Sequence, residues 1–195
     1  MMTGSPGISS RAAAILKSRE ILLLNPIYLD TETTGLKSSD EIIEISLVND
    51  AGEVIYESLI RPTQLISPEA MAVHGISNQD VQNAPPWYVI WPTLRTHLFG
   101  REIGIYNAEF DLRMMQQSHA RHHLPWKENL KSFDIMQLYA RYKGEWDSFR
   151  KSYRYQSLDK AGKECKINIP NAHRAATDSL LARAVLHFMA DSDPG

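Results

Sequence analysis

Two acidic residues, Asp30 and Glu32, lie two positions apart at the end of the apolar run 27–29. A β-strand places residues i and i+2 on one face with Cα atoms roughly 7 Å apart, so the two carboxylates would stand side by side. Like charges so placed repel, and a divalent cation bound to both, such as Mg²⁺ or Mn²⁺, removes that repulsion. Two acidic residues with this spacing are also typical of solvated acids at a strand end. The interpretation as a metal site therefore depends on the rest of the chain.

Length and composition predict one domain. The chain has 195 residues, of which 43% are apolar, and this suffices to bury a core. We expect a main domain at 26–190, a tail and short helix at 1–25, and a disordered end at 191–195. No apolar window approaches the roughly 18 residues of a membrane span, and no signal peptide is recognisable. We therefore expect a soluble, cytoplasmic protein with no membrane partner. The single cysteine, Cys165, excludes an intramolecular disulfide.

The order of the predicted elements favours an α/β fold. Two strand-like runs, 42–48 and 53–61, are joined by the turn sequence 49–52, and with the first strand they form three antiparallel strands. Shorter runs at 103–106 and 132–134 lead directly into helices, as in parallel α/β units. The predicted fold is a mixed sheet of three antiparallel strands plus parallel strands, with helices on both faces. Helices are predicted at about 11–22, 68–74, 86–99, 108–122, from 157 onward, and 174–189.

A third acid, Asp111, follows the strand 103–106 in the first turn of a helix. Asn107 lies four residues earlier, so the two side chains share a helix face at the sheet edge where α/β proteins bind ligands. An acid in this position also complements the helix dipole, and the neighbouring Phe110 fits either core packing or base stacking. Both alternatives remain open at this point.

A fourth acid, Asp178, lies on the apolar stripe of the last helix with Leu181 and Val185. A carboxylate there is costly unless it is paired or bound to a metal. His173 is five residues earlier, about 140° away on a continuous helix, so it can reach the same site only from a loop before the helix. Taken alone, His173 also fits a surface loop histidine.

Three segments of the chain, at 30–36, 106–111 and 173–178, resemble the three motifs of the DEDDh exonucleases. This family includes the proofreading subunit of bacterial replicative DNA polymerase and ribonuclease T. The resemblance spans about residues 26 to 190. It implies a ribonuclease-H-like fold and metal-dependent 3′→5′ hydrolysis of nucleic acid.

The same resemblance implies a role for each acidic motif residue. Asp30, Glu32 and Asp178 would hold one divalent ion, Mg²⁺ or Mn²⁺, and Asp30 with Asp111 would hold a second. His173 would be the general base, a role that suits an imidazole titrating near neutrality. The implied substrate is the free 3′ hydroxyl end of a single strand, with DNA favoured over RNA, and the products are 5′ mononucleotides.

Further residues are implied to contact the terminal nucleotide. They are Thr33, Gly35, Leu36, His74, Asn107 and Phe110. His74 and Leu36 also fit a purely structural role.

One basic segment stands out from the chain's net charge of −2: between 142 and 156 aromatic residues alternate with Lys and Arg. Proteins that bind single strands combine stacking faces with positive charge in this way. A loop with packed aromatics and solvated charges explains the pattern equally well.

Two classes of function are consistent with the sequence. The first is an active exonuclease, which the complete set of four acids and one histidine favours. The second is a binding or assembly module of the same fold that docks on a polymerase or another replication or repair partner. Metal-dependent digestion of labelled oligonucleotides separates the two.

Overall fold

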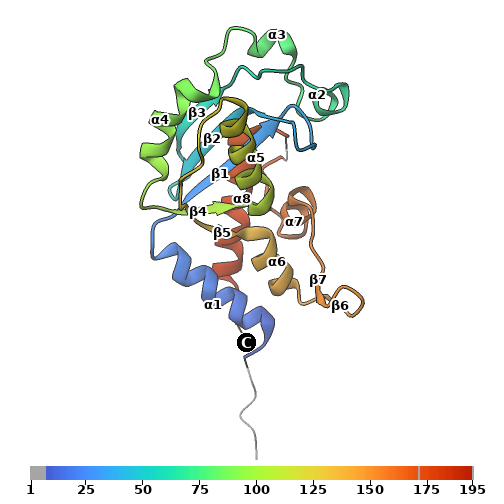
Figure 1. The fold of residues 1–195 in the computed structure, drawn as a ribbon. Coiled ribbons are helices and arrows are strands. Elements are labelled where there is room, and N and C mark those ends of the chain that lie inside the picture. The colour runs from blue at the N-terminus through green and yellow to red at the C-terminus, as the bar shows by residue number, and fades with distance from the viewer. Residues whose placement is uncertain (1–7, 171, 195) are drawn as a thin grey trace, which may run out of the picture.

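A five-stranded mixed sheet with helices on both faces forms the centre of the computed structural model, which describes residues 8–170 and 172–194 (Figure 1). The strands are β1 Ile27–Thr33, β2 Ile42–Asn49, β3 Val54–Leu59, β4 Glu102–Ile105, β5 Lys131–Asp134 and, in a separate hairpin, β6 Trp146–Asp147 and β7 Ser152–Tyr153. The helices are α1 Ser10–Leu22, α2 Pro68–His74, α3 Asn78–Val81, α4 Trp87–Leu98, α5 Ala108–Arg121, α6 Ile135–Lys143, α7 Leu158–Glu164 and α8 Ala175–Asp191.

The strand order is β3-β2-β1-β4-β5. Strand β2 pairs antiparallel with both β1 and β3, while β4 runs parallel to β1 and to β5. The predicted mixed α/β sheet is therefore confirmed, including its three antiparallel strands. The short hairpin and helix α3 were not predicted.

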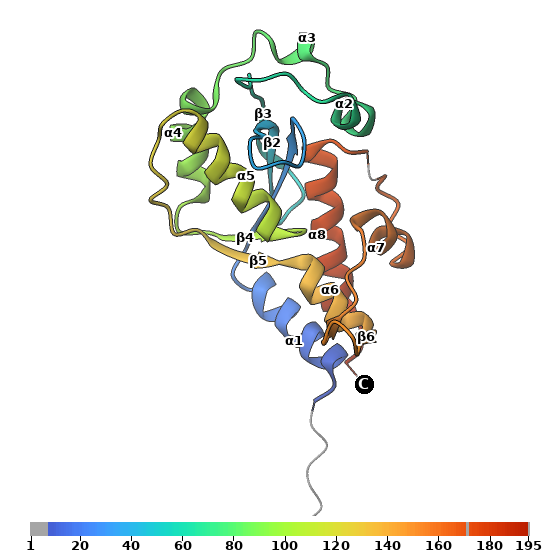
Figure 2. The same ribbon diagram turned by 45° about the vertical axis from the view of Figure 1, so that its right-hand side comes forward.

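Side chains alternate between the two faces of the sheet along β1, and this decides which helices Asp30 and Glu32 face. Ile27 and Leu29 are buried with residues of α4 and α5, whereas Tyr28 is buried with residues of α1, α6 and α8. Since side chains alternate along a strand, Asp30 and Glu32 continue the face covered by α8. Figure 2 shows α5 and α8 on the two sides of the end of β1.

Local signals fix helix α2, which borders this end of β1. Ser67 caps its first turn by accepting from the Ala70 N–H, and Pro68 occupies the first helical position. Gly75 ends the helix in the left-handed conformation, with φ 74°. The sequence predicted this helix and its glycine stop.

Residues at both ends of the chain pack against the sheet domain. Ala14 and Ile15 of α1 lie in the same buried cluster as residues of α6 and α8, so the short helix predicted within 1–25 packs on the domain core. At the other end, α8 runs to Asp191, and the Ser192 hydroxyl is hydrogen bonded to Tyr142 Oη at 3.0 Å. Packing contacts therefore continue past residue 190, and the domain bounds of 26–190 stay a prediction. Residues 1–7 and 195 lie outside the described residues.

Helices long and apolar enough to cross a membrane do not occur among the residues that the structure describes.

Candidate active site

Three carboxylates converge where β1 ends. One oxygen atom from each of Asp30, Glu32 and Asp178 lies within 4.8 Å of the others. Asp178 comes from the first turn of α8 and is only 5% exposed. Next to this cluster the β1–β2 register shifts between Glu32 and Thr33, an irregularity common beside active sites. An all-oxygen donor set of this kind fits a hard divalent cation such as Mg²⁺ or Mn²⁺.

The fourth acid, Asp111, approaches from the other side of β1. It lies in the first turn of α5, is 3% exposed, and its Oδ1 accepts a hydrogen bond from Thr31 Oγ1 at 2.7 Å. Thr31 points away from Asp30 and Glu32 because successive strand residues face opposite sides. Asp111 is outside the three-carboxylate group, and its charge acts on Asp30. The structure thus brings all four predicted acids to one end of β1.

Burial and mutual repulsion change the acidity of the four carboxylic acids. Burial raises the pKa of Asp30 well above its ordinary range, and the charges of Asp111 and Glu32 raise it further. Burial, followed by the nearby Asp178 carboxylate, raises the pKa of Glu32 to about 8. Burial also raises the pKa of Asp111 to about 7, against the Thr31 hydrogen bond that lowers it, and the pKa of Asp178 to about 6. Without a cation the cluster would therefore retain protons near neutral pH, and a divalent ion can take their place.

His173 lies in the bend before α8, where the sequence analysis expected it. Its backbone is left-handed, with φ 48°, and its side chain is exposed. Hydrogen bonds from the backbone of Ala172 and His173 lower the pKa of Asp178, against the larger effect of burial. The bend is therefore tied directly to the carboxylate cluster. The role of His173 as general base stays a prediction.

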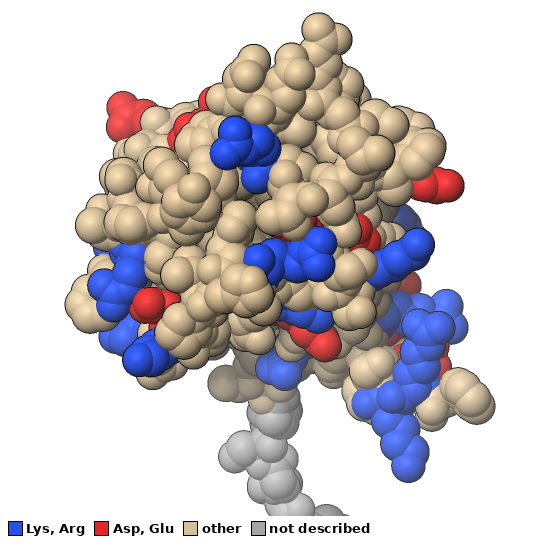
Figure 3. Space-filling model, turned by 45° about the horizontal axis from the view of Figure 1, so that its top comes forward, with Lys and Arg blue, Asp and Glu red and all other residues tan. Residues whose placement is uncertain are grey.

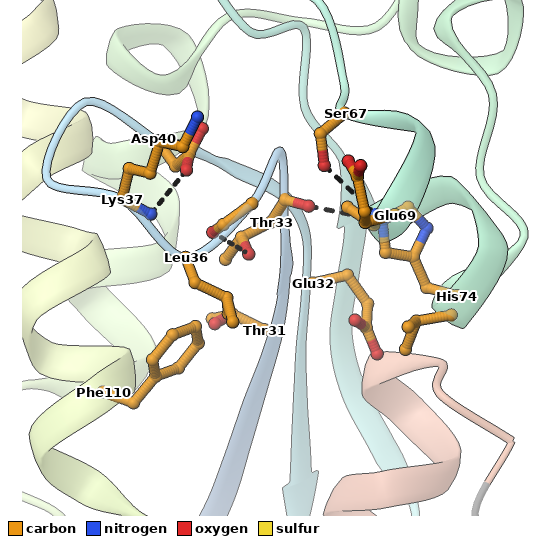
Figure 4. A pocket seen from close by; sticks show the side chains of 13 residues that line it. Thr31, Glu32, Thr33, Leu36, Lys37, Asp40, Ser67, Glu69, His74 and Phe110 are labelled. Carbon is orange, nitrogen blue, oxygen red and sulfur yellow. Dashed lines mark hydrogen bonds between the residues drawn. The ribbon is translucent and has the colours of Figure 1, made fainter.

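Beside the carboxylates is a cavity of about 560 Å³. Figure 4 shows Leu36 and Phe110 on one side of it and Glu69 and His74 of α2 on the other. The Leu36 side chain is 76% exposed, so it does not belong to the core. The residues that line the cavity are Thr31, Glu32, Thr33, Gly35, Leu36, Lys37, Asp40, Ser67, Glu69, Ala70, Val73, His74 and Phe110.

The loop that carries Leu36 is held by the buried carboxylate of Asp40. Asp40 Oδ2 accepts from the Lys37 N–H at 2.6 Å, and Oδ1 accepts from Thr34 Oγ1 at 2.8 Å. A Cβ atom on Gly35 would lie 2.7 Å from Asp40 Oδ2, so glycine permits this close approach. Sequence reasoning missed Asp40, although it is an acid directly before the buried run that forms β2.

His74 lines the cavity, but both of its ring nitrogens bind backbone atoms. Nδ1 accepts from the Ile76 N–H at 3.0 Å, which leaves Nε2 to donate to the Thr33 carbonyl at 3.2 Å. Burial lowers the pKa of His74, so the neutral ring that this pairing requires is favoured. His74 therefore joins α2 to the end of β1, and its contact with a nucleotide stays a prediction.

Asn107 is not among the residues that line the cavity. It precedes α5 in the left-handed conformation, with φ 74°, is exposed, and makes no side-chain cap hydrogen bond. In the first turn of α5 the Ala108 N–H instead donates to Asp134 Oδ2 at 3.0 Å. The contact of Asn107 with the terminal nucleotide stays a prediction.

The chain matches a known protein family over most of its length. The Exonuclease family model matches residues 27–186. An uncharacterized exonuclease of Escherichia phage 186 is 35% identical over 170 residues, which cover 84% of this chain and 87% of the phage protein. The epsilon subunit of DNA polymerase III from Escherichia coli K12 is 31% identical over 99 residues, and the match covers 46% of this chain and 41% of the subunit.

Solved structures give the same result for the fold. Exonuclease X in complex with 5′ overhanging duplex DNA matches with a TM-score of 0.60 and 28% identity, over 85% of this chain and 92% of that chain. E. coli exonuclease I in complex with a dA16 oligonucleotide matches with a TM-score of 0.65 and 18% identity, over 81% of this chain and 39% of that one. The ribonuclease-H-like exonuclease fold predicted from the sequence is confirmed.

Proposed function

Because the chain belongs to the exonuclease family, we propose that it is a metal-dependent 3′→5′ exonuclease that acts on single-stranded nucleic acid, with DNA favoured over RNA. The observation that carries this proposal is the convergence of Asp30, Glu32 and Asp178 within 4.8 Å, with Asp111 buried on the other side of β1. Exonuclease X, which is 28% identical and was solved in complex with 5′ overhanging duplex DNA, supports DNA as the substrate.

Two divalent ions fit the donor set. In this proposal Asp30, Glu32 and Asp178 hold one ion, and Asp30 with Asp111 holds the other. When bound, such ions lower the pKa of a water molecule and neutralise the charge that develops on the transferred phosphate. The raised pKa values of the four acids support a bound cation, because burial disfavours the charged form of each acid and neighbouring acids raise the pKa values of Asp30 and Glu32 further.

The protein side chains would act by positioning and by proton transfer. His173, exposed beside Asp178, would accept the proton of the attacking water. Leu36 and Phe110 would enclose the terminal base, since both side chains present apolar surface to the cavity. Residues of the loop 34–40 line the cavity together with residues of α2, and an enclosed terminal nucleotide favours action on a chain end over a continuous strand.

The test is a side-by-side digestion of matched 5′-labelled single-stranded DNA, duplex DNA and RNA by the purified protein. With Mg²⁺ or Mn²⁺ we expect stepwise shortening from the 3′ end and release of 5′ mononucleotides, fastest on single-stranded DNA. EDTA and Asp30→Asn should both abolish the reaction. A wild-type protein that binds but never shortens any of these strands would instead support the second function.

That second function is a binding module for a polymerase or another replication or repair partner. The similarity to the polymerase epsilon subunit favours it. The presence of all four carboxylates and His173 supports catalysis in either case, so a partner would add to the activity and need not replace it.

A further inference from the structure

The β6–β7 hairpin carries cations and aromatic rings outside the cavity described above. We call this surface the hairpin patch. It comprises Arg141, Trp146, Phe149, Arg150, Lys151, Arg154 and Tyr155. The sequence left two explanations for these residues, a strand-binding surface or a loop with packed aromatics.

The hairpin has a defined backbone. Trp146 pairs with Tyr153 across the two strands, and their rings meet edge to face with centroids 5.2 Å apart. Asp147 Oδ1 accepts from the N–H groups of Phe149 and Arg150, at 3.0 and 3.1 Å. The backbone of the turn is therefore held by its own hydrogen bonds.

Packing does not account for the aromatic residues. Phe149 is 93% exposed, Trp146 56% and Tyr155 55%. Large rings at this exposure gain little from the hydrophobic core, and clustered exposed rings are typical of binding surfaces.

Charge distinguishes the patch from the rest of the chain. From residue 141 to 154 the sequence has five Lys or Arg and two Asp or Glu, a net charge of 5 − 2 = +3, whereas the whole chain has a net charge of −2. Within the described part of the chain, Arg141, Arg150 and Lys151 form no ion pair, and Arg154 lies 3.8 Å from Asp147. Figure 3 shows Lys and Arg side chains gathered over this hairpin at the lower right. The patch is therefore complementary to an anion.

A hollow of about 360 Å³ lies between the hairpin and helices α1 and α6. Its lining includes two cations, Arg141 and Lys151, and three rings, those of Trp146, Tyr153 and Tyr155. Aromatic faces beside cations suit a nucleic acid strand, because every base stacks and every nucleotide carries a phosphate. An acidic peptide would use the charges but leave most of the rings without a partner.

The hairpin lies at the opposite end of α8 from the carboxylates. Asp178 is in the first turn of α8, while Tyr142, at the end of α6 next to the hairpin, contacts Ser192 just after α8. The rise of 1.5 Å per helical residue makes this separation about 20 Å. A stacked strand covers that distance with about six nucleotides at 3.4 Å each.

We propose that the hairpin patch is a second binding site for single-stranded nucleic acid, which holds the strand about six or more nucleotides before the 3′ end. This inference rests on the proposed exonuclease function, since it assigns the patch to the same substrate. It predicts that long strands use the patch, while short strands and single-nucleotide esters do not.

The test compares the wild type with Arg150→Glu/Lys151→Glu/Arg154→Glu. The control, Lys17→Glu/Lys127→Glu/Lys131→Glu, changes the net charge by the same amount at exposed positions elsewhere. The substrates are the p-nitrophenyl ester of thymidine 5′-phosphate and oligothymidylates of about 4 and about 16 nucleotides, on either side of the six-nucleotide span. The hairpin variant should raise the KM of the long strand about tenfold and flatten its salt dependence, because lost phosphate contacts release fewer counterions. The ester and the short strand should react as in the wild type.

A second variant, Trp146→Ala/Phe149→Ala, tests the rings. It should weaken binding of the long strand with an unchanged salt slope, because stacking releases no counterions. Binding of the long strand in EDTA, measured by fluorescence anisotropy, gives a readout that does not depend on catalysis. If the wild type shortens neither the long nor the short strand, the proposed function fails, while this binding assay still tests the patch. Equal affinities of wild type, hairpin variant and control for the long strand would overturn the inference and leave the patch to a protein partner.

Discussion

Arg174 binds the buried carboxylate of Glu44 through two nitrogens. Its Nε lies 3.0 and 3.1 Å from the two Glu44 oxygens, and its Nη2 also donates to Oε1. Glu44 is 1% exposed and pairs with Glu32 across the β1–β2 ladder. Its Oε2 further accepts from the Ala175 N–H at 2.9 Å, in the first turn of α8. Strand β2 therefore fixes the residue that directly follows His173.

We expect Arg174→Ala to lower kcat about 10- to 100-fold with little change in KM, because small displacements of a catalytic group cost this much. It should also lower the free energy of unfolding by about 1–3 kcal/mol, since it leaves a buried carboxylate without its cation. Adding Glu44→Gln removes that charge, so the double variant should recover stability in urea unfolding but not kcat. Wild-type kcat in Arg174→Ala would show that the pair does not position His173.

Long-range pairs of this kind mark the limit of what the sequence predicts. Local periodicity singled out the four acids, Asp30 and Glu32 by strand alternation and Asp111 and Asp178 by helix position, and the resemblance to the exonuclease motifs implied their common role. Glu44 is an acid inside the apolar run of β2, which indicates that it needs a partner. That partner, Arg174, lies 130 residues away in the sequence. Only the fold shows which cation meets Glu44.

The hairpin and the role of Asp40 in the loop 34–40 were missed for a different reason. Strands β6 and β7 have two residues each, too few for an alternation pattern. The loop 34–40 is held by Asp40 and by Gln64, whose Nε2 donates to Asp40 Oδ1 at 2.7 Å. Hydrogen bonds between residues far apart in the chain leave no pattern in the sequence spacing of residue types.

The metal-free protein should lose stability as the pH rises. The pKa values of Asp178, Asp111 and Glu32 are raised, to about 6, 7 and 8. The folded state therefore binds these protons more tightly than the unfolded chain does. The contribution of these protons to stability is fully present below about pH 4, and it is lost as the pH rises through about 6 to 8. Urea unfolding in EDTA at about pH 5 and pH 8 measures this loss.

Buried histidines with lowered pKa values, such as His74 and His119, act in the opposite direction, so a matched variant is needed. Asp30→Asn removes one charge from the cluster, and it should raise the metal-free stability at about pH 8 and reduce its fall with pH. Mg²⁺ should stabilise the wild type at this pH more than it stabilises Asp30→Asn. A metal-free stability of Asp30→Asn that falls with pH as steeply as that of the wild type would contradict the repulsion argument.

His173→Ala should slow hydrolysis by about 10²- to 10⁴-fold, the usual range for the loss of a general base. Stability and Mg²⁺ binding should change little, because the side chain is exposed. His123→Ala is a matched control: His123 is also exposed and has a left-handed backbone, with φ 55°. The measurement is kcat for both variants across the neutral pH range. Wild-type turnover in His173→Ala at every pH would place the base elsewhere.

A 3′ phosphate should inhibit the enzyme strongly, and closed single-stranded circles should resist it. The cavity beside the carboxylates is bounded by Leu36 and Phe110 on one side and by α2 on the other, so it suits a chain end. An added 3′ phosphate would bring negative charge toward Glu32 and Glu69, which line the cavity and would repel it. Matched linear strands with a 3′ hydroxyl or a 3′ phosphate, together with circles of the same sequence, measure both effects. Cleavage of circles at the rate of linear strands would assign the fold to an endonuclease.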